Sequence, residues 1–170
     1  MTLHITQFEG SNALSSFRVQ QLLPALQGVH EKIAGISARF VHLVAGDSAP
    51  DAALSAQLAA LLTYGDPYTG PTDGPLIVVS PRLGTVSPWA SKATDIAHNC
   101  GLAVHRIERL VEYRLTLKNG LLSKTALTAG QLERVAALLH DRMTESAMLE
   151  RAQALGCSAP CRLRPWTMWM

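Results

Sequence analysis

Hydrophobic and polar residues alternate along much of this chain with the period of a β-strand. LHITQF, residues 3–8, alternates weakly and predicts a first strand that Gly10 closes. ISARFVHLVA, residues 36–45, and LIVVS, residues 76–80, are apolar on both faces, which is typical of strands covered on both sides. Residues 105–117 alternate over a longer run and predict a strand with one wetter face. That wetter face carries Arg106, Glu108, Leu110, Glu112 and Arg114.

Between these strands, apolar residues recur every three or four positions, which predicts helices. The first helix opens at Ser11-Asn12, and Pro24 is expected to kink it or end it early, because proline lacks the backbone N–H that a helix interior needs. The second helix begins at Pro50-Asp51 and ends at Tyr64-Gly65, before a loop rich in proline and glycine over residues 66–74.

Local signals define the last two helices. Ser87 is an N-cap, Pro88 suits the first helical position, and Gly101 is placed for a left-handed C-terminal residue. The apolar face of this third helix holds Trp89, Ala93, Ile96, Ala97 and Cys100. Thr128 and Gln131 form a capping box for the fourth helix. Its apolar stripe holds Leu132, Val135, Ala136, Leu139 and Met143.

The order strand, helix, strand, helix therefore occurs twice, over residues 3–65 and again over residues 75–149. This order predicts an α+β fold built from two βαβ-type halves, with helices packed on an antiparallel or mixed sheet. The two halves share no residue-level repeat, so the element order alone indicates two copies of one unit.

Composition narrows the function classes. The 170 residues suit one domain, and a net charge of +2 without a basic run argues against nucleic acid and anionic membranes as partners. We expect a protein partner. Three cysteines and the lack of a leader or membrane-length apolar segment predict a cytoplasmic protein with reduced thiols.

The candidate reactive residues do not form a recognisable site. His98 and Cys100 lie two positions apart on a helix and point in different directions, so we expect no catalytic residue there. Cys157 and Cys161 lack a second pair of ligands, and we expect no metal site. His42, flanked by apolar residues, is expected to be a buried histidine with its hydrogen bonds satisfied.

The turn before the third helix has two interpretations. In one, its polar residues are simply solvated, and Lys92 and Asp95 form a weak surface pair. In the other, free backbone N–H groups of the turn meet an anion or the carboxylates of a partner. The residues involved are Arg82, Gly84, Thr85, Ser87 and Lys92. No Walker or dinucleotide glycine pattern occurs in this turn.

A longer comparison of this region points to a family. PRLGTVSPWASKATDIAHNCGL, residues 81–102, resembles the sequence that marks the N-terminal domain of large, single-chain phosphoribosylformylglycinamidine synthases. ALSSFRVQQLL, ARFVHLV, LLTYG, HRIERLVEYRL and LHDRMTES follow the order of that family, so the resemblance spans roughly residues 8–146. In the family this domain is similar to a dimer of PurS, the small subunit of the multi-subunit enzyme.

The resemblance implies a structural function. The family converts formylglycinamide ribonucleotide with ATP, magnesium and glutamine, but its ATP and magnesium ligands and its glutaminase triad belong to domains with no counterpart here. The resemblance thus implies no cofactor and no activity for this chain alone. It implies a domain that bridges the synthetase and glutaminase domains and helps to shield ammonia. The expected contact residues are Arg82, Gly84, Thr85, Ser87, Trp89, Lys92, Asp95 and Asn99.

Two alternatives remain open. The chain is also compatible with a free-standing, PurS-like adaptor that joins separate synthetase and glutaminase proteins. The other alternative is a small enzyme that uses the turn over residues 82–92 as an anion site.

The C-terminal residues depart from the family pattern. We expect a PurS-like domain over residues 1–149 and an aberrant tail over residues 150–170. CRLRPWTMWM has neither helical nor strand periodicity, and its codons, read two bases later, can encode Pro-Pro-Ala-Pro-Leu-Asp-Asp-Val-Asp, which resembles the family's linker. A frameshift or truncation is the predicted cause, and a genuine membrane-seeking or partner-seeking tail is the competing interpretation.

Overall fold

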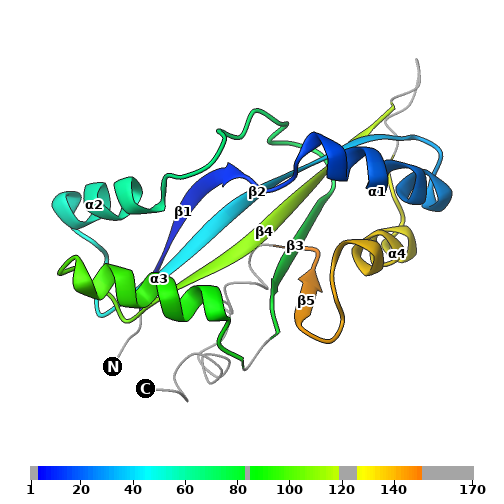
Figure 1. Ribbon diagram of the computed structural model, residues 1–170. Helices are drawn as coiled ribbons and strands as arrows, with labels where there is room; N and C mark the ends of the chain where they lie inside the picture. Colours follow the sequence, from blue (N-terminus) through cyan, green and yellow to red (C-terminus); the bar gives the residue numbers. More distant parts are fainter. Residues whose placement is uncertain (1–3, 83–84, 119–125, 151–170) are drawn as a thin grey trace.

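The structure, a computed structural model, describes residues 4–82, 85–118 and 126–150. Within these residues, strands and helices alternate in chain order (Figure 1). Four helices pack on a five-stranded sheet, which confirms the predicted α+β class. The elements are β1 His4–Asn12, α1 Ser16–Val29, β2 Ile33–Gly46, α2 Ala52–Leu62, β3 Leu76–Pro81, α3 Pro88–Asn99, β4 Arg106–Leu117, α4 Ala129–Leu139 and β5 Glu145–Met148.

The sheet has the strand order β1-β2-β4-β3-β5, and every neighbouring pair is antiparallel. The long strands β2 and β4 meet in the middle, where Ile36 lies opposite Leu115 and Val44 opposite Ile107. Each long strand is flanked by the strand that precedes it across a helix, so β1-α1-β2 and β3-α3-β4 repeat one arrangement. The two predicted halves are therefore present, in antiparallel form. The short edge strand β5 was not predicted.

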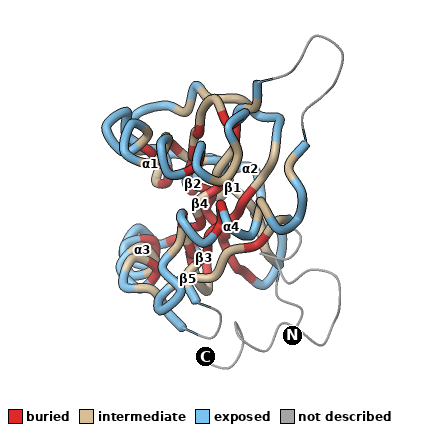
Figure 2. Tube along the Cα trace, turned by 90° about the vertical axis from the view of Figure 1, so that its right-hand side faces the viewer, coloured by how far each residue is buried: buried red, intermediate tan, exposed pale blue. Residues whose placement is uncertain are grey.

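All four helices cover one face of the sheet, as the views in Figures 1 and 2 show. One core cluster joins α1 and α4 to the sheet through Leu26, Val135 and Leu115. A second cluster joins α2 and α3 to the sheet through Leu58, Ala97 and Ile107. Each helix pair contains one helix from each half, so the halves interlock and share both cores.

The opposite face carries a smaller apolar cluster, which includes Val41, Leu43 and Leu110. On this face the structure contradicts the prediction of a wetter side for β4, because Glu108 and Glu112 are only 2% and 1% exposed. Buried carboxylates are tolerated when cations and hydrogen-bond donors surround them. Arginines supply that compensation here, as described below.

The N-terminal boundaries also differ from the prediction. Gly10 does not close β1, which continues to Asn12 through an irregular register between Glu9 and Asn12. A Cβ at Gly10 would lie 2.7 Å from Cε1 of His42, so this glycine permits a close approach of the backbone to that ring. Helix α1 consequently starts later than predicted, with Ser15 as its N-cap.

Pro24 neither ends α1 nor shortens it, since the helix continues to Val29. The helical turn after the proline is anchored by Leu26, which is completely buried in the core between α1 and α4. Burying a leucine side chain stabilises by about 1.5–3 kcal/mol, which is comparable with the roughly 3 kcal/mol penalty of an interior proline. Tertiary packing therefore offsets the local helix-breaking effect of the proline.

The predicted helix ends are confirmed elsewhere. Ser87 caps α3, Gly101 takes a left-handed conformation at φ +74°, and Thr128 forms its capping box with Gln131.

The predicted apolar face of α3 was partly wrong, since Ala90 and Ala97 are buried whereas Ile96 and Cys100 are exposed. Helix α3 is turned toward β4 by Thr94, whose hydroxyl accepts a 3.0 Å hydrogen bond from the N–H of Ile107. Met143, assigned to the stripe of α4, lies beyond that helix and is 75% exposed.

Candidate functional site

The turn between β3 and α3 is held by hydrogen bonds at both ends. The N–H of Arg82 donates to the carbonyl of Thr144 at 2.9 Å, which ties the turn to the segment before β5. The carbonyl of Arg82 accepts from the N–H of Thr85 at 3.1 Å and from its hydroxyl at 2.6 Å. Ser87 accepts from the N–H of Ala90 at 3.0 Å and thereby caps α3. The conformation at both ends of the turn is fixed by the chain itself.

A buried carboxylate links this turn to β4. Ser87 Oγ donates to Glu108 Oε1 at 2.8 Å, and Arg106 Nη2 donates to Glu108 Oε2 at 2.8 Å. Arg106 also donates to the carbonyl of Thr85 at 3.3 Å. Glu108 therefore holds the helix cap in position, because charge-assisted hydrogen bonds are stronger and more directional than neutral ones.

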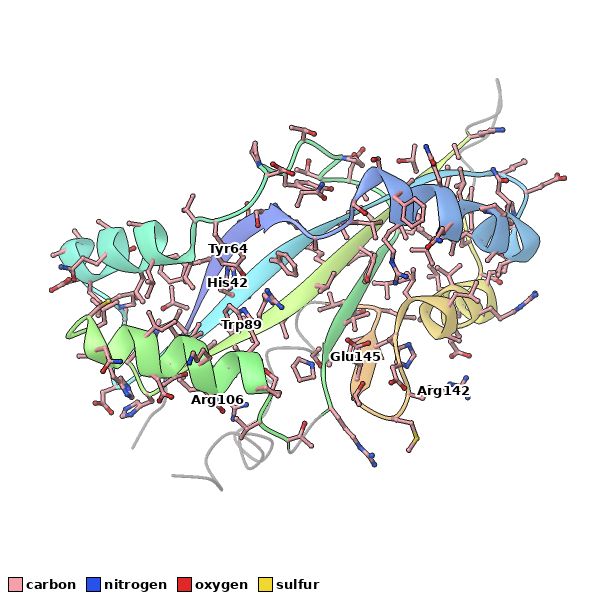
Figure 3. The ribbon with its side chains drawn as sticks, viewed as in Figure 1. His42, Tyr64, Trp89, Arg106, Arg142 and Glu145 are labelled. Carbon is pink, nitrogen blue, oxygen red and sulfur yellow. The ribbon has the colours of Figure 1, made fainter. Side chains whose placement is uncertain are left out.

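A groove of about 490 Å³ lies beside the turn. Its walls come from the turn, from the first residues of α3, from β3 and β4, and from the segment that leads into β5. Figure 3 shows Trp89 on the side of α3 and Glu145 on the side of β5. The residues that line it include Arg82, Ser87, Trp89, Arg109, Met143 and Glu145.

Arg109 occupies the wall that β4 contributes to this groove. Its guanidinium carbon lies 4.3 Å from the ring centre of Phe40 and 4.7 Å from that of Trp89. Arg109 Nη1 also donates to the Tyr64 hydroxyl, with a separation of 3.4 Å. Aromatic contacts of this kind stabilise a cation by roughly 0.5–2 kcal/mol each, and here they fix the side chain.

His42 lies behind this arginine and is completely buried. Its Nε2 lies 2.8 Å from the Tyr64 hydroxyl, and its ring stacks near Trp89 at 5.5 Å between centres. The pKa of His42 is lowered to about 4, mainly by burial and to a smaller extent by the positive charge of Arg109. The backbone of Phe8 has a weaker, opposing effect on this pKa. His42 is therefore neutral near pH 7, and its Nε2 can accept a hydrogen bond from the Tyr64 hydroxyl. Burial was predicted correctly, but the prediction of satisfied hydrogen bonds holds only for Nε2, because Nδ1 makes no hydrogen bond of normal geometry with the described residues.

Comparison with known families shows to which family this chain belongs. The family described as formylglycinamide ribonucleotide amidotransferase N-terminal matches residues 39–156, which is more than half of the chain. The chain belongs to this family. It therefore carries the N-terminal domain of the purine-biosynthesis enzyme that is also called phosphoribosylformylglycinamidine synthase, which confirms the resemblance. The match ends at residue 156, and the proposed division of the chain at residues 149 and 150 stays a prediction.

In this amidotransferase N-terminal domain, the predicted contact residues do not all lie in one place. Arg82, Thr85, Ser87 and Trp89 line the groove beside the turn. Lys92 lines a second, smaller groove of about 260 Å³ between α2 and α3, to which Trp89 also contributes. Asp95 and Asn99 are exposed on α3 and line neither groove, whereas Gly84 lies outside the described residues.

The sequence reasoning missed the residues that the other strands bring to the same place. Phe40 comes from β2, Tyr64 from the segment just after α2, and Arg109 from β4. None of them is near the turn in the sequence. One signal was available, because Arg109 is a charged residue on the face of β4 that otherwise carries Ile107, Val111 and Leu115. A lone arginine on an apolar face needs a specific environment.

Residues 4–82, 85–118 and 126–150 contain no group of three or more histidine, cysteine, aspartate or glutamate side chains that could hold a metal ion. None of the helices described in those ranges is long and apolar enough to cross a membrane.

Proposed function

We propose that this domain bridges the synthetase and glutaminase domains of the amidotransferase and helps to shield ammonia that passes between their sites. Membership of the family implies association with the other parts of that enzyme. In this proposal the domain contributes no reacting group. It contributes a surface of fixed shape against which the two catalytic parts are aligned.

The observation that carries the proposal is the fixed position of Arg82 and of residues 85–87, at the two ends of the turn. Hydrogen bonds to Thr144 and Glu108 hold these residues, so they lose little conformational entropy when a partner binds. The turn also borders a groove with apolar and charged walls, which gives a partner more to bind than a purely solvated loop would. We assign the contact surface to this turn and to the outer face of α3, with Lys92, Asp95 and Asn99.

The test uses a complete single-chain enzyme of the family in which residues 1–150 of this chain form the N-terminal domain. Lys92→Glu and Asp95→Lys each reverse a charge on the proposed surface. We expect glutamine-dependent synthesis to fall about tenfold, equivalent to ~1.4 kcal/mol of lost interdomain interaction. Synthesis driven by added ammonium should stay within about twofold of the parent, because the synthetase site is untouched.

Glu133→Lys is the matched control, because Glu133 is exposed on α4, away from the turn. It should leave both activities unchanged. Equal losses in the glutamine and ammonium assays would contradict the bridging function, and no loss with either surface variant would contradict the assignment of the contact surface to Lys92 and Asp95.

A further inference from the structure

Arg109 differs from the other arginines of the two central strands. Arg39 and Arg114 both pair with Glu112, and Arg106 pairs with Glu108, at separations of 2.8–3.0 Å. Those pairs lie on the helix-free face of the sheet. On the helix-covered face, no carboxylate of the described residues lies within ion-pair distance of Arg109.

The side chain of Arg109 is nevertheless held in one position. Phe40 and Trp89 contact its guanidinium, and Tyr64 accepts one of its hydrogen bonds. A guanidinium has five N–H donors, so this single bond leaves donors available to an acceptor in the groove. An arginine fixed in advance loses little entropy when it binds a planar, bidentate acceptor.

The groove offers an apolar rim next to this cation. Val86 and Met143 line it and are 43% and 75% exposed, so their apolar surface is accessible to an occupant of the groove. Exposed methionine is common on surfaces that bind protein segments, because its flexible thioether adapts to the partner. Arg82 adds a second positive charge to the lining.

Glu145 sets a limit on the charge of the occupant. It also lines the groove, and its Oε2 accepts a 2.9 Å hydrogen bond from the N–H of Asp141. A doubly charged phosphate would be repelled more strongly by this carboxylate than a singly charged aspartate or glutamate side chain. The apolar rim likewise suits the aliphatic part of a peptide segment.

We propose that the groove receives an aspartate or glutamate side chain from a segment of the synthetase or glutaminase domain, and that its carboxylate pairs with Arg109. This inference rests on the proposed bridging function and names the chemistry of one contact within it. The partner carboxylate supplies the counter-charge that the described residues do not give Arg109, while Trp89 and Met143 contact the flanking apolar atoms.

Zero-length cross-linking tests this pairing in the complete enzyme that carries residues 1–150. The Arg109→Lys variant places a reactive amine in the groove, and carbodiimide joins an amine to a carboxylate only when the two are in contact. We expect mass spectrometry to find a cross-link from position 109 to one aspartate or glutamate of the synthetase or glutaminase part. Arg134→Lys, at an exposed position of α4, should give no such product.

Three results would overturn the proposal. The first is no cross-link from position 109, and the second is a cross-link only to Glu145 of the same domain. The third is a saturable change of tryptophan fluorescence when inorganic phosphate is added to the 170-residue chain with Trp166→Phe and Trp169→Phe, which leave Trp89 as its tryptophan. If Arg109→Met abolishes that change, the groove is a small-anion site.

The two proposals fail in different ways. Loss of glutamine-dependent synthesis in the Lys92→Glu variant without a cross-link from position 109 would keep the bridging function and reject the carboxylate contact. A cross-link from position 109 without any effect of Lys92→Glu or Asp95→Lys would keep the carboxylate contact and contradict the wider contact surface.

Discussion

Strand β4 carries arginines on both of its faces, and their surroundings differ. On the helix-free face, Arg106 and Arg114 bind buried glutamates of the same strand. On the helix-covered face, Arg109 contacts aromatic rings and borders a groove. The first arrangement satisfies its charges within the domain, whereas the second leaves a fixed cation for a partner. The comparison separates residues that maintain the fold from residues that are available for association.

The largest expected effect concerns the helix-free face, where arginines pair with buried glutamates; this face is called the paired face below. Glu112→Gln leaves Arg39 and Arg114 beside a neutral amide, and we expect the free energy of unfolding to fall by about 3 kcal/mol, because a buried charge loses its counter-charge. Urea denaturation measures this change. Glu133→Gln on the exposed side of α4 should change stability by less than about 0.5 kcal/mol. Equal, small effects of both variants would show that the pairs on this face are not structural.

A second effect concerns the helix-covered face at low pH. The folded-state pKa of His42, about 4, lies below the ordinary value of 6.5, so the unfolded chain binds a proton first as the pH falls. The stability that neutral His42 contributes is complete above about pH 6.5 and is lost as the pH falls toward 4, by up to about 3 kcal/mol.

The His42→Gln variant isolates this contribution. The difference in unfolding free energy between parent and variant should shrink between about pH 7 and about pH 4, while His4→Gln, at an exposed residue, should follow the parent. A constant difference across this range would contradict the shifted pKa.

The sequence predicted what depends on neighbours in the chain. The caps of α3 and α4 and the left-handed Gly101 follow from residues within a few positions of each other. Burial of Glu112 depends on Arg39, which lies 73 positions away, and periodicity alone could only assign a charged residue to a wet face. The groove likewise combines α3 with β4, so the turn was recognised but Arg109 was not.

A third, smaller effect concerns the close packing behind Arg109. Gly10→Ala places a methyl group 2.7 Å from the His42 ring, and we expect a loss of about 1–3 kcal/mol as the ring shifts. Gly28→Ala is the matched control, since nothing lies within 4 Å of its Cβ position in α1. That control should stabilise by about 0.5–1 kcal/mol, as alanine favours the helix. Thermal denaturation distinguishes the two, and a neutral Gly10→Ala would show that the ring is loosely held.

The smallest expected effect concerns Arg109, on the helix-covered face, compared with Arg39, on the helix-free face. Arg109→Met removes the cation but keeps apolar contact with Phe40 and Trp89, so stability should fall by about 1 kcal/mol, the lower end of the range for two cation–aromatic contacts. Arg39→Met, on the paired face, should lower the free energy of unfolding several times as much, because the buried carboxylate of Glu112 loses one of its arginine partners. Urea denaturation of both variants makes the comparison, and similar losses would mean that Arg109 is a structural residue as well.

Hydrogen–deuterium exchange tests the central claim most directly. The amides of residues 85–92 would be compared between the 170-residue chain alone and the complete enzyme that carries residues 1–150. We predict slower exchange of these amides in the complete enzyme, because the other domains cover the turn and the start of α3. Unchanged exchange there, together with protection confined to β1 and α2, would contradict the assignment of this face as the contact surface.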